Sequence, residues 1–199
     1  MAVRRRFDRR YYARFYEDPV RAVDSEPERT RLVRFVLAAM DLLELPVREV
    51  LDLGAGTGAW GRVLRVLRPE ARYRGVEASA YACRRHGWER GTVQDYAGAP
   101  ADLVVCQGVL QYLDEAAATR AIDNLARLSR GALYLEVLTR RDWDTVCDQE
   151  RTDDRVWLRT GRWYLDRLRE HFLPFGGGLF LPRAFSARLY ELEAPSLVE

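Results

Sequence analysis

The glycines at positions 54, 56 and 58 constrain this chain more than any other residues. They follow the mainly apolar run 50–53, and an amphipathic run at 57–67 places Trp60, Val63 and Leu64 on one helical face. A strand that turns through glycines into a helix brings a ligand close to bare backbone, because glycine lacks Cβ and tolerates positive φ. The start of the helix also offers unpaired N–H groups. The segment therefore predicts a turn that binds a nucleotide-like ligand.

Strand-like and helical runs alternate after this turn. Ser79 and Asp114 are suitable N-caps, and Gly87 and Gly131 are suitable C-terminal stops. Strands of continuous apolar character suit a parallel sheet that is covered on both faces. The alternation predicts an α/β fold with a doubly wound, Rossmann-like sheet. The expected strands are 49–53, 73–76, 92–93, 102–106 and 132–137, with two antiparallel closing strands at 174–180 and 185–192; the expected helices are 26–43, 57–67, 79–86, 114–128 and 162–172.

Length and composition favour one domain, with an N-terminal helical cap at 1–45 and a core at 46–199. No apolar run is long enough to span a membrane, and the Arg-rich N-terminus lacks the apolar stretch of a secretory signal. A net charge of +2 gives no overall attraction to nucleic acid. Every basic residue other than histidine is Arg, which is typical of a GC-rich, bacterial genome. Three widely spaced cysteines form neither a disulfide framework nor a zinc pattern, so we expect a reducing cytoplasm.

Acidic residues occur close to three expected strand ends. Glu77 ends the second strand about twenty residues after the glycine turn, where a carboxylate can accept hydrogen bonds from ribose hydroxyls. Asp95 follows the third strand and could accept a hydrogen bond from the amino group of adenine. Asp52 stands two residues before the first glycine. Each also has a simpler interpretation: Glu77 and Asp95 as exposed loop or turn acids, and Asp52 as a buried carboxylate held by backbone N–H groups.

These segments resemble class I S-adenosylmethionine-dependent methyltransferases of the small-molecule type. The resemblance rests on VLDLGAGTG at 50–58, GVEAS at 75–79, QDY at 94–96 and DLVVCQGVLQYL at 102–113, and it extends from about 47 to 137. It implies a seven-stranded, mostly parallel sheet whose last strand runs antiparallel. It also implies S-adenosylmethionine as cofactor and a small-molecule acceptor.

The resemblance implies a role for each motif residue. Asp52 would face the ammonium group of the cofactor, and Glu77 would hold the ribose hydroxyls. Ala78 would lie beside the adenine, Asp95 would accept from its amino group, and Tyr96 would pack near the ring. The residues that would line the methionine and ribose are Gly54, Ala55, Gly56, Gly58, Gln107 and Gly108.

The acceptor is expected above the ends of the fourth and fifth strands. Glu136 lies near the end of an otherwise apolar strand and is either a pocket residue or a paired structural acid. Tyr12 and Tyr16 belong to an N-terminal aromatic segment that either covers the site or packs on the core. The acids at 142–148 predict no metal site, because spacing alone is a weak signal. Candidates for catalysis are Glu136, Tyr12 and Tyr16, and candidates for acceptor binding are Gln111, Tyr112, Glu136 and Trp143.

Two other functions fit parts of the pattern. Gly54, Gly56 and Ala59 loosely match the glycine fingerprint of NAD(P)-dependent oxidoreductases, and Glu77 matches their ribose-binding acid. Asp52 and Asp95 do not belong to that fingerprint. A non-catalytic subunit that binds S-adenosylmethionine and serves as a partner is the second alternative. The sequence indicates neither the acceptor atom nor the oligomeric state.

Overall fold

The computed structural model describes residues 7–17 and 26–185. A seven-stranded sheet with the order β3-β2-β1-β4-β5-β7-β6 forms its centre. β1 to β5 run parallel, and β7 runs antiparallel to both of its neighbours. This confirms the predicted doubly wound sheet with an antiparallel last strand. The strands are β1 Glu49–Leu53, β2 Arg72–Glu77, β3 Glu89–Arg90, β4 Ala101–Gln107, β5 Ser129–Glu136, β6 Phe172–Gly176 and β7 Leu179–Pro182.

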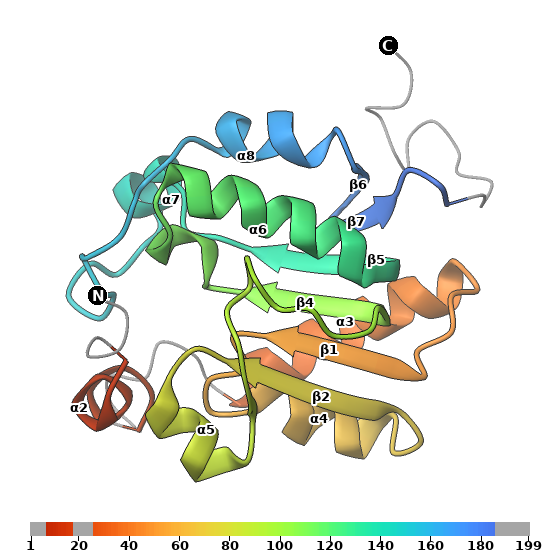
Figure 1. The fold of residues 1–199 in the computed structure, drawn as a ribbon, viewed down its shortest axis with the longest axis horizontal. Helices are drawn as coiled ribbons and strands as arrows, with labels where there is room; N and C mark the ends of the chain where they lie inside the picture. The colour runs from red at the N-terminus through yellow and green to blue at the C-terminus, as the bar shows by residue number, and fades with distance from the viewer. Residues whose placement is uncertain (1–6, 18–25, 186–199) are drawn as a thin grey trace.

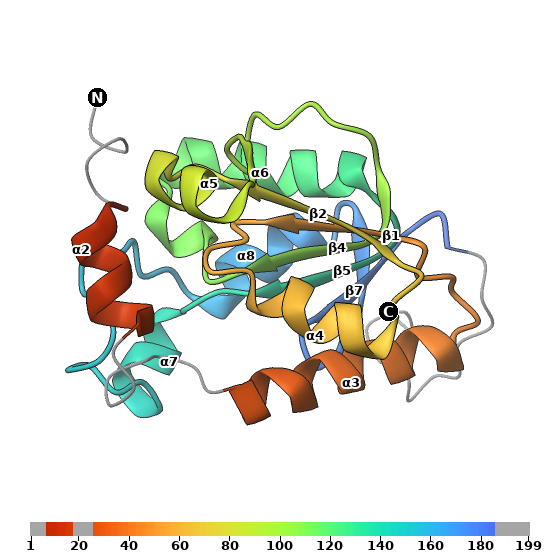
Figure 2. The same cartoon turned by 90° about the horizontal axis from the view of Figure 1, so that it is seen from below.

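Helices cover both faces of the sheet. Figure 2 shows α3 and α4 on one side of the strands and α5 and α6 on the other. Ser79 accepts from the N–H of Ala82, and Asp114 accepts from that of Ala117, which confirms both predicted N-caps. The helices are α2 Arg9–Tyr12, the π-helix η1 Ala13–Glu17, α3 Glu26–Leu42, α4 Ala59–Leu67, α5 Ala80–His86, the 3-10 helix η2 Leu110–Tyr112, α6 Glu115–Leu128, α7 Arg140–Thr145 and α8 Gly161–Leu168.

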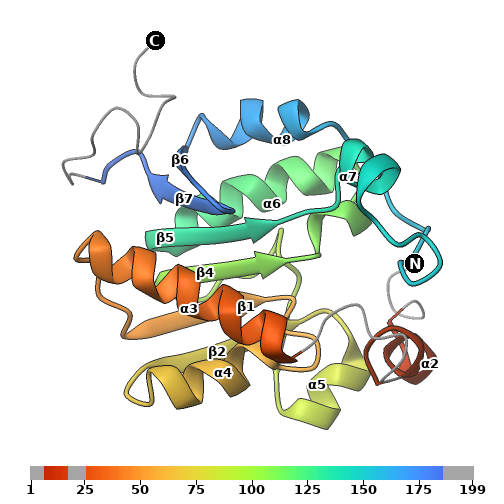
Figure 3. The ribbon, with the colours of Figure 1, turned by 180° about the vertical axis from the view of Figure 1, so that it is seen from behind.

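The core forms two layers, one on each face of the sheet. Along β1, Leu51 and Leu53 pack with residues of α6 and α8, whereas Val50 packs with residues of α3 and α4. This alternation follows from the two-residue period of a strand. Full burial of each such leucine contributes roughly 1.5–3 kcal/mol. Figure 3 shows α3 lying across the sheet over β1 and β4.

The strand order reverses between β1 and β4, next to the glycine turn. In open α/β sheets, ligands bind at such a point, outside the carboxyl ends of the strands. The arrowheads of β1, β2, β4 and β5 point toward the end of the molecule where α2 lies (Figure 1). The N-terminal segment is therefore placed over the edge at which a ligand is expected. No helix among the described residues is long and apolar enough to cross a membrane.

The third strand lies earlier than predicted. The structure pairs Glu89 with Val76 and Arg90 with Glu77, and the expected strand at 92–93 is wrong. The carbonyl of Thr92 accepts hydrogen bonds from the N–H groups of Asp95 and Tyr96, at 3.2 and 2.9 Å, so this segment turns. The strand consequently ends at Arg90.

The closing strands also differ from the prediction. Three glycines at 176–178 have φ of 119°, 57° and 83° and turn the chain between β6 and β7, so the expected strand at 174–180 is a hairpin instead. The expected strand at 185–192 lies, beyond Phe185, outside the described residues. The helix expected at 162–172 ends at Leu168, because Phe172 already pairs with Pro182 in the sheet.

Candidate functional site

A cavity lies at the carboxyl ends of β1, β2 and β4. Its floor is the glycine turn, one wall follows the end of β2, and another follows the loop after β4. Residues of the N-terminal segment cover it. The sequence-predicted residues that line it are Gly54, Gly56, Glu77, Ala78, Gln107, Gly108, Tyr12, Tyr16 and Tyr112.

The glycine turn leaves room for a ligand at its centre. The N–H groups of Gly54 and Ala55 donate to the carbonyl of Val76 at 2.8 and 3.1 Å, which ties the turn to β2. A Cβ on Gly54 would lie 2.3 Å from the Cγ2 atom of Val109. Gly56 has φ of 51°, and a Cβ there would meet only the carbonyl of Gly54, at 3.8 Å. A ligand can therefore approach the backbone of Gly56 closely.

The carboxylate of Glu77 is held by backbone donors. Oε2 accepts from the N–H of Gly56 at 3.0 Å, and Oε1 accepts from the N–H of Ser79 at 2.8 Å. Burial raises the pKa of Glu77, and the hydrogen bonds from Ser79 and Gly56 oppose this shift. The side chain thus joins the glycine turn to the end of β2 and lies against the cavity. The N–H of Ala78 and the hydroxyl of Tyr12 also donate hydrogen bonds to this carboxylate.

Asp52 is buried beneath the glycine turn and does not line the cavity. The hydroxyl of Tyr73 donates to its Oδ2 at 2.5 Å. Burial raises the pKa of Asp52 to about 7, although the hydrogen bond from Tyr73 and the positive charge of Arg29 act in the opposite direction. The sequence offered a simpler interpretation of Asp52, as a buried carboxylate held by N–H groups of the turn. The structure confirms the burial, but the hydrogen bond to this carboxylate comes from the phenol of Tyr73.

Trp88 supports the glycine turn from behind, a role that sequence reasoning did not detect. Its indole N–H donates to the carbonyl of Gly56 at 2.9 Å. A Cβ on Gly58 would lie 2.6 Å from its ring, and a Cβ on Gly75 would lie 2.5 Å from it. The N–H of Gly56 donates to Glu77, so hydrogen bonds fix Gly56 at both its N–H and its carbonyl. In the sequence, Trp88 stands out only as a tryptophan directly after Gly87.

Aromatic side chains of the N-terminal segment cover the cavity. The hydroxyls of Tyr11 and Tyr112 are 2.9 Å apart, and the ring of Phe7 packs edge-on against Tyr112 at 5.1 Å between centroids. On the opposite side, the hydroxyl of Ser79 donates to the carbonyl of Phe7 at 2.5 Å. Tyr12 is buried, and Tyr16 is 41% exposed. The segment is thus attached both to the start of α5 and to η2, on either side of the cavity.

Polar side chains meet at the ends of β4 and β5. Gln107 accepts at Oε1 from the indole N–H of Trp60 at 2.8 Å, and also from the guanidinium of Arg29. Its Nε2 donates to Oε2 of Glu136 at 3.0 Å, and the hydroxyl of Tyr134 donates to the same oxygen at 3.0 Å. Glu136 is exposed. Arg29 was not expected from the sequence, because it comes from a helix far from the motifs.

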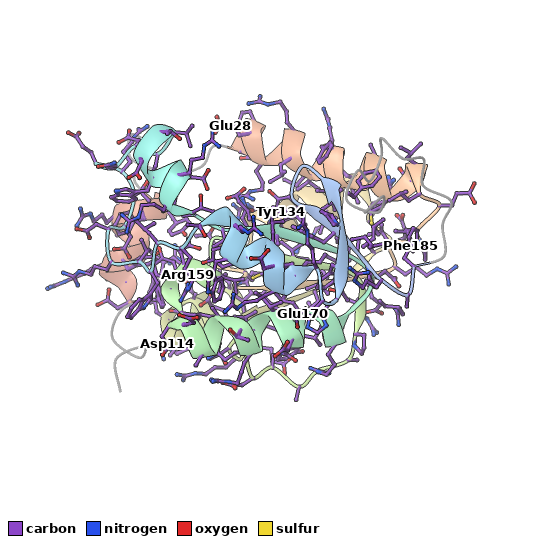
Figure 4. The ribbon with its side chains drawn as sticks, turned by 90° about the horizontal axis from the view of Figure 1, so that it is seen from above. Glu28, Asp114, Tyr134, Arg159, Glu170 and Phe185 are labelled. Atoms are coloured by element: carbon purple, nitrogen blue, oxygen red, sulfur yellow. The ribbon has the colours of Figure 1, made fainter. Side chains whose placement is uncertain are left out.

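Arg159 fixes the loop that follows β4. Its Nη2 donates to the carbonyl of Leu113 at 2.6 Å and its Nη1 to that of Leu110 at 3.5 Å. Figure 4 shows Arg159 at the same end of the molecule as Asp114, the N-cap residue of α6. The segment before α8 therefore supports the wall of the cavity that η2 provides.

Several predicted site residues lie elsewhere. Asp95 is exposed, and its carboxylate accepts from the hydroxyl of Thr92 at 2.9 Å. Tyr96 is buried in the core, where its hydroxyl donates to Glu89 at 2.8 Å. The turn after β3 directs both away from the cavity. Within the described ranges, no group of three His, Cys, Asp or Glu residues could hold a metal ion. The remaining predicted residues that do not line the cavity are Ala55, Gly58, Gln111, Glu136 and Trp143.

Comparisons with solved structures show the shared fold. The PH0226 protein from Pyrococcus horikoshii is 16% identical, with a TM-score of 0.63 over 87% of this chain and 99% of that one. An S-adenosylmethionine-dependent methyltransferase from Clostridium acetobutylicum is 17% identical, with a TM-score of 0.52 over 66% of this chain and 58% of that one. Magnesium protoporphyrin IX methyltransferase from Synechocystis is 18% identical, with a TM-score of 0.52 over 72% of this chain and 73% of that one.

Sequence comparison identifies the family. No curated protein matches the chain in sequence. A family described as a methyltransferase domain matches residues 10–189, which is most of the chain and includes every residue of the glycine turn and of the cavity except Phe7. The chain therefore belongs to the methyltransferase domain family.

Proposed function

We propose that the protein transfers a methyl group from S-adenosylmethionine to a small-molecule acceptor. The observation that carries this proposal is the cavity between the glycine turn and Glu77, at the point where the strand order reverses. The open space over Gly56 suits close approach of a ligand to the backbone. The buried carboxylate of Glu77 suits the two hydroxyls of a ribose. Both features fit the adenosine part of this cofactor.

The methionine part would lie toward Gln107 and Gly108. Both residues line the cavity, and the guanidinium of Arg29 contacts Gln107. A guanidinium forms strong, charge-assisted hydrogen bonds with carboxylates. We therefore expect Arg29 and Gln107 to be the residues closest to the carboxylate of the cofactor. Asp52 lies beneath the same turn and would act on the ammonium group through the intervening backbone or water.

The cofactor supplies a methyl group that its sulfonium already activates. The protein then has to align the acceptor with that methyl group and exclude water. Tyr11, Tyr12 and Phe7 cover the cavity and supply a largely apolar roof. This enclosure supports an acceptor of small size, as does the name of the Synechocystis enzyme with the same fold.

A carboxylate beside Gln107, outside the lining of the cavity, is the candidate proton acceptor. The exposed carboxylate of Glu136 is oriented by Gln107 and Tyr134, which both donate to Oε2 and leave Oε1 for an acceptor N–H or O–H. Tyr12 is less suited to this role, because burial raises its pKa and keeps the phenol protonated. We assign Glu136 the role of general base where the acceptor atom needs one.

Calorimetric titration with S-adenosylhomocysteine tests the proposal. We expect S-adenosylhomocysteine to bind at micromolar concentration and NADH not to bind. In a separate assay, S-adenosylmethionine labelled on its methyl group should transfer that methyl to a metabolite fraction of an extract. Absence of S-adenosylhomocysteine binding at millimolar concentration would contradict the proposal. Binding without any methyl transfer would instead favour a non-catalytic partner subunit. We also propose a reducing cytoplasm as the compartment, because the three cysteines are widely spaced in the sequence.

Trp88 offers a test of how the glycine turn is held. Phenylalanine at this position keeps a ring against Gly58 and Gly75 but removes the N–H that donates to Gly56. A net hydrogen bond of this kind contributes about 1 kcal/mol, so Trp88→Phe should weaken S-adenosylhomocysteine binding roughly 5-fold. Calorimetry measures this change, and a thermal melt checks the fold.

Trp163→Phe is the matched control for Trp88→Phe. Its indole N–H donates to Glu115 at 3.3 Å, on α6 and outside the cavity. We expect this variant to bind S-adenosylhomocysteine as the wild type does. Equal affinities for the two variants would mean that the hydrogen bond from Trp88 does not position the turn.

A further inference from the structure

A second cavity adjoins the cavity over the glycine turn. Its volume is about 840 Å³, and its lining comes from two segments far apart in the sequence, within residues 8–15 and within residues 149–155, which follow α7. Figures 1 and 2 both show α2 and α7 at the same end of the molecule. Tyr11 lines both cavities, and its hydroxyl lies 2.9 Å from that of Tyr112, which lines the first. The two cavities therefore meet at Tyr11.

The cavity over the glycine turn is too small to hold the cofactor and the acceptor together. Its volume is about 180 Å³, whereas pockets for single ligands measure about 300–1,000 Å³. The proposed function assigns this cavity to the cofactor, so most of the acceptor has to lie elsewhere. The second cavity has the volume of a single-ligand pocket and begins at Tyr11, where an acceptor could reach the first.

Aromatic rings line the second cavity beside its polar residues. The ring of Phe15 is buried, and its centroid lies 5.1 Å from that of Tyr11. The guanidinium of Arg14 lies over the ring of Phe15, 5.0 Å from its centroid. This cation–π contact holds the guanidinium at the wall of the cavity. A ligand there would meet an apolar surface next to a positioned positive charge.

The two segments present opposite charges to the second cavity. Arg10 and Arg14 belong to the N-terminal segment, whereas Glu150 and Asp154 belong to the segment after α7. All four are exposed, and no described residue forms a hydrogen bond or ion pair with their charged groups. Asp8, the acid that the N-terminal segment adds to the lining, accepts at Oδ1 from two backbone N–H groups of α2 at 2.9 and 3.1 Å. Both kinds of charge thus remain available to a ligand.

Asp153 and Arg155 complete the charged lining. Oδ1 of Asp153 accepts from the N–H of Arg155 at 3.1 Å. The segment after α7 therefore carries more acids than bases at the cavity, and the N-terminal segment carries more bases than acids. A ligand with a single charge would be attracted by one segment and repelled by the other. A ligand with both charges would be attracted by both segments.

We propose that the second cavity binds the acceptor and that the acceptor is a small zwitterion of the amino acid class, an inference that rests on the proposed function. Its carboxylate would contact Arg10 and Arg14, because guanidinium groups bind carboxylates through charge-assisted hydrogen bonds. Its ammonium group would contact Glu150 and Asp154, and its reacting atom would reach the methyl group past Tyr11. A phosphate monoester, with a charge of about −1.5 to −2, would be repelled by the acidic segment.

Selective depletion of an extract tests the charge of the acceptor. The full chain and S-adenosylmethionine labelled on its methyl group are mixed with a metabolite fraction that is untreated, passed over a cation exchanger at about pH 2, or passed over an anion exchanger at about pH 11; carboxyl and amino groups titrate between these limits. Each fraction is neutralised before the assay. We expect methyl transfer with the untreated fraction alone, because a zwitterion is a cation at the first pH and an anion at the second. Transfer that survives either column would overturn the proposed class.

Two neutral variants test the second cavity as the binding site. Arg14→Gln and Asp154→Asn each remove one charge from its lining, and we expect each to lower the rate of methyl transfer at limiting acceptor about 10-fold. S-adenosylhomocysteine should bind both variants with wild-type affinity, because neither residue lines the first cavity. The matched controls are Arg9→Gln on α2 and Asp144→Asn on α7, which are exposed and line neither cavity. We expect both controls to transfer methyl at the wild-type rate.

The outcomes separate this inference from the proposed function. If both variants melt normally and transfer methyl as fast as their controls, the second cavity is not the acceptor site, although the proposed function stands. A loss of rate in only one of the two variants would contradict a zwitterion. If the wild type does not bind S-adenosylhomocysteine, the proposed function fails together with this inference. Binding without transfer to the untreated fraction would also overturn both.

Discussion

Replacing Glu77 with glutamine is expected to weaken binding of S-adenosylhomocysteine about 100-fold. A hydrogen bond to a charged group contributes about 1.5–3 kcal/mol, and we assign two ribose hydroxyls to this carboxylate. Glutamine would also direct its amide N–H₂ toward either the N–H of Gly56 or that of Ser79, which both donate to Glu77 in the native protein. A loss of roughly 2.7 kcal/mol corresponds to the 100-fold change. Calorimetry at fixed pH measures it.

The fold should tolerate this change. Burial raises the pKa of Glu77, so neutralising the side chain removes a charge that the interior disfavours. Glu89→Gln is the matched control, because Glu89 is exposed on the neighbouring strand and does not line the cavity. We expect it to bind with wild-type affinity. If Glu77→Gln binds as tightly as Glu89→Gln while both melt normally, ribose does not contact Glu77.

The residues that could be predicted are those whose local sequence determines their backbone. Gly54 and Gly56 adopt positive φ between a strand and a helix, as their spacing predicted. Glu77 was found because a strand end in a parallel sheet fixes where the next side chain lies. The N-caps Ser79 and Asp114 are also local features. At these positions the local backbone conformation and the tertiary structure favour the same residue, so the sequence alone is enough to predict it.

The remaining parts of the site depend on contacts between distant segments. A shift of the third strand to Glu89–Arg90 moved Asp95 out of the cavity and left Gln94 in its wall. Two residues are a short strand, so its position is set by pairing with β2 rather than by its own composition. Trp88 and Arg29 act on the turn and on Gln107 across the fold. No spacing rule in one sequence reveals such partners.

Asp52 should make the stability of the protein depend on pH in the neutral range. Burial raises its pKa from an ordinary value of 3.8 to about 7, against the opposing effects of Tyr73 and Arg29; the charge of Glu77 raises it further. The native carboxyl therefore keeps its proton up to about pH 7, whereas the unfolded chain loses it near pH 4. The contribution of this group to the free energy of unfolding is fully present below about pH 4. It is lost as the pH rises from there through 7, because the unfolded chain releases the proton first.

Asp52→Asn, which has no proton to lose, should therefore gain stability relative to the wild type as the pH rises. One pKa unit corresponds to 1.36 kcal/mol, so the two units between pH 5 and the pKa give roughly 2.7 kcal/mol. Urea unfolding at pH 5 and pH 8 measures the free energy of unfolding of both proteins. Other groups titrate in both proteins, and the difference between the two isolates Asp52. Asparagine still accepts from Tyr73, so the comparison keeps this hydrogen bond.

Asp102→Asn provides a control of the opposite kind. Burial raises the pKa of Asp102, but hydrogen bonds from the N–H groups of Glu49 and Arg48 and from Arg130 outweigh it, so the pKa lies below its ordinary value. Its carboxylate is ionised in both states between pH 5 and 8, and its removal should destabilise the protein equally at the two pH values. Parallel stability curves for Asp52→Asn and the wild type over this range would show that Asp52 is already ionised beneath the glycine turn. A difference that grows with pH for Asp52→Asn and stays constant for Asp102→Asn would place the titrating proton on Asp52.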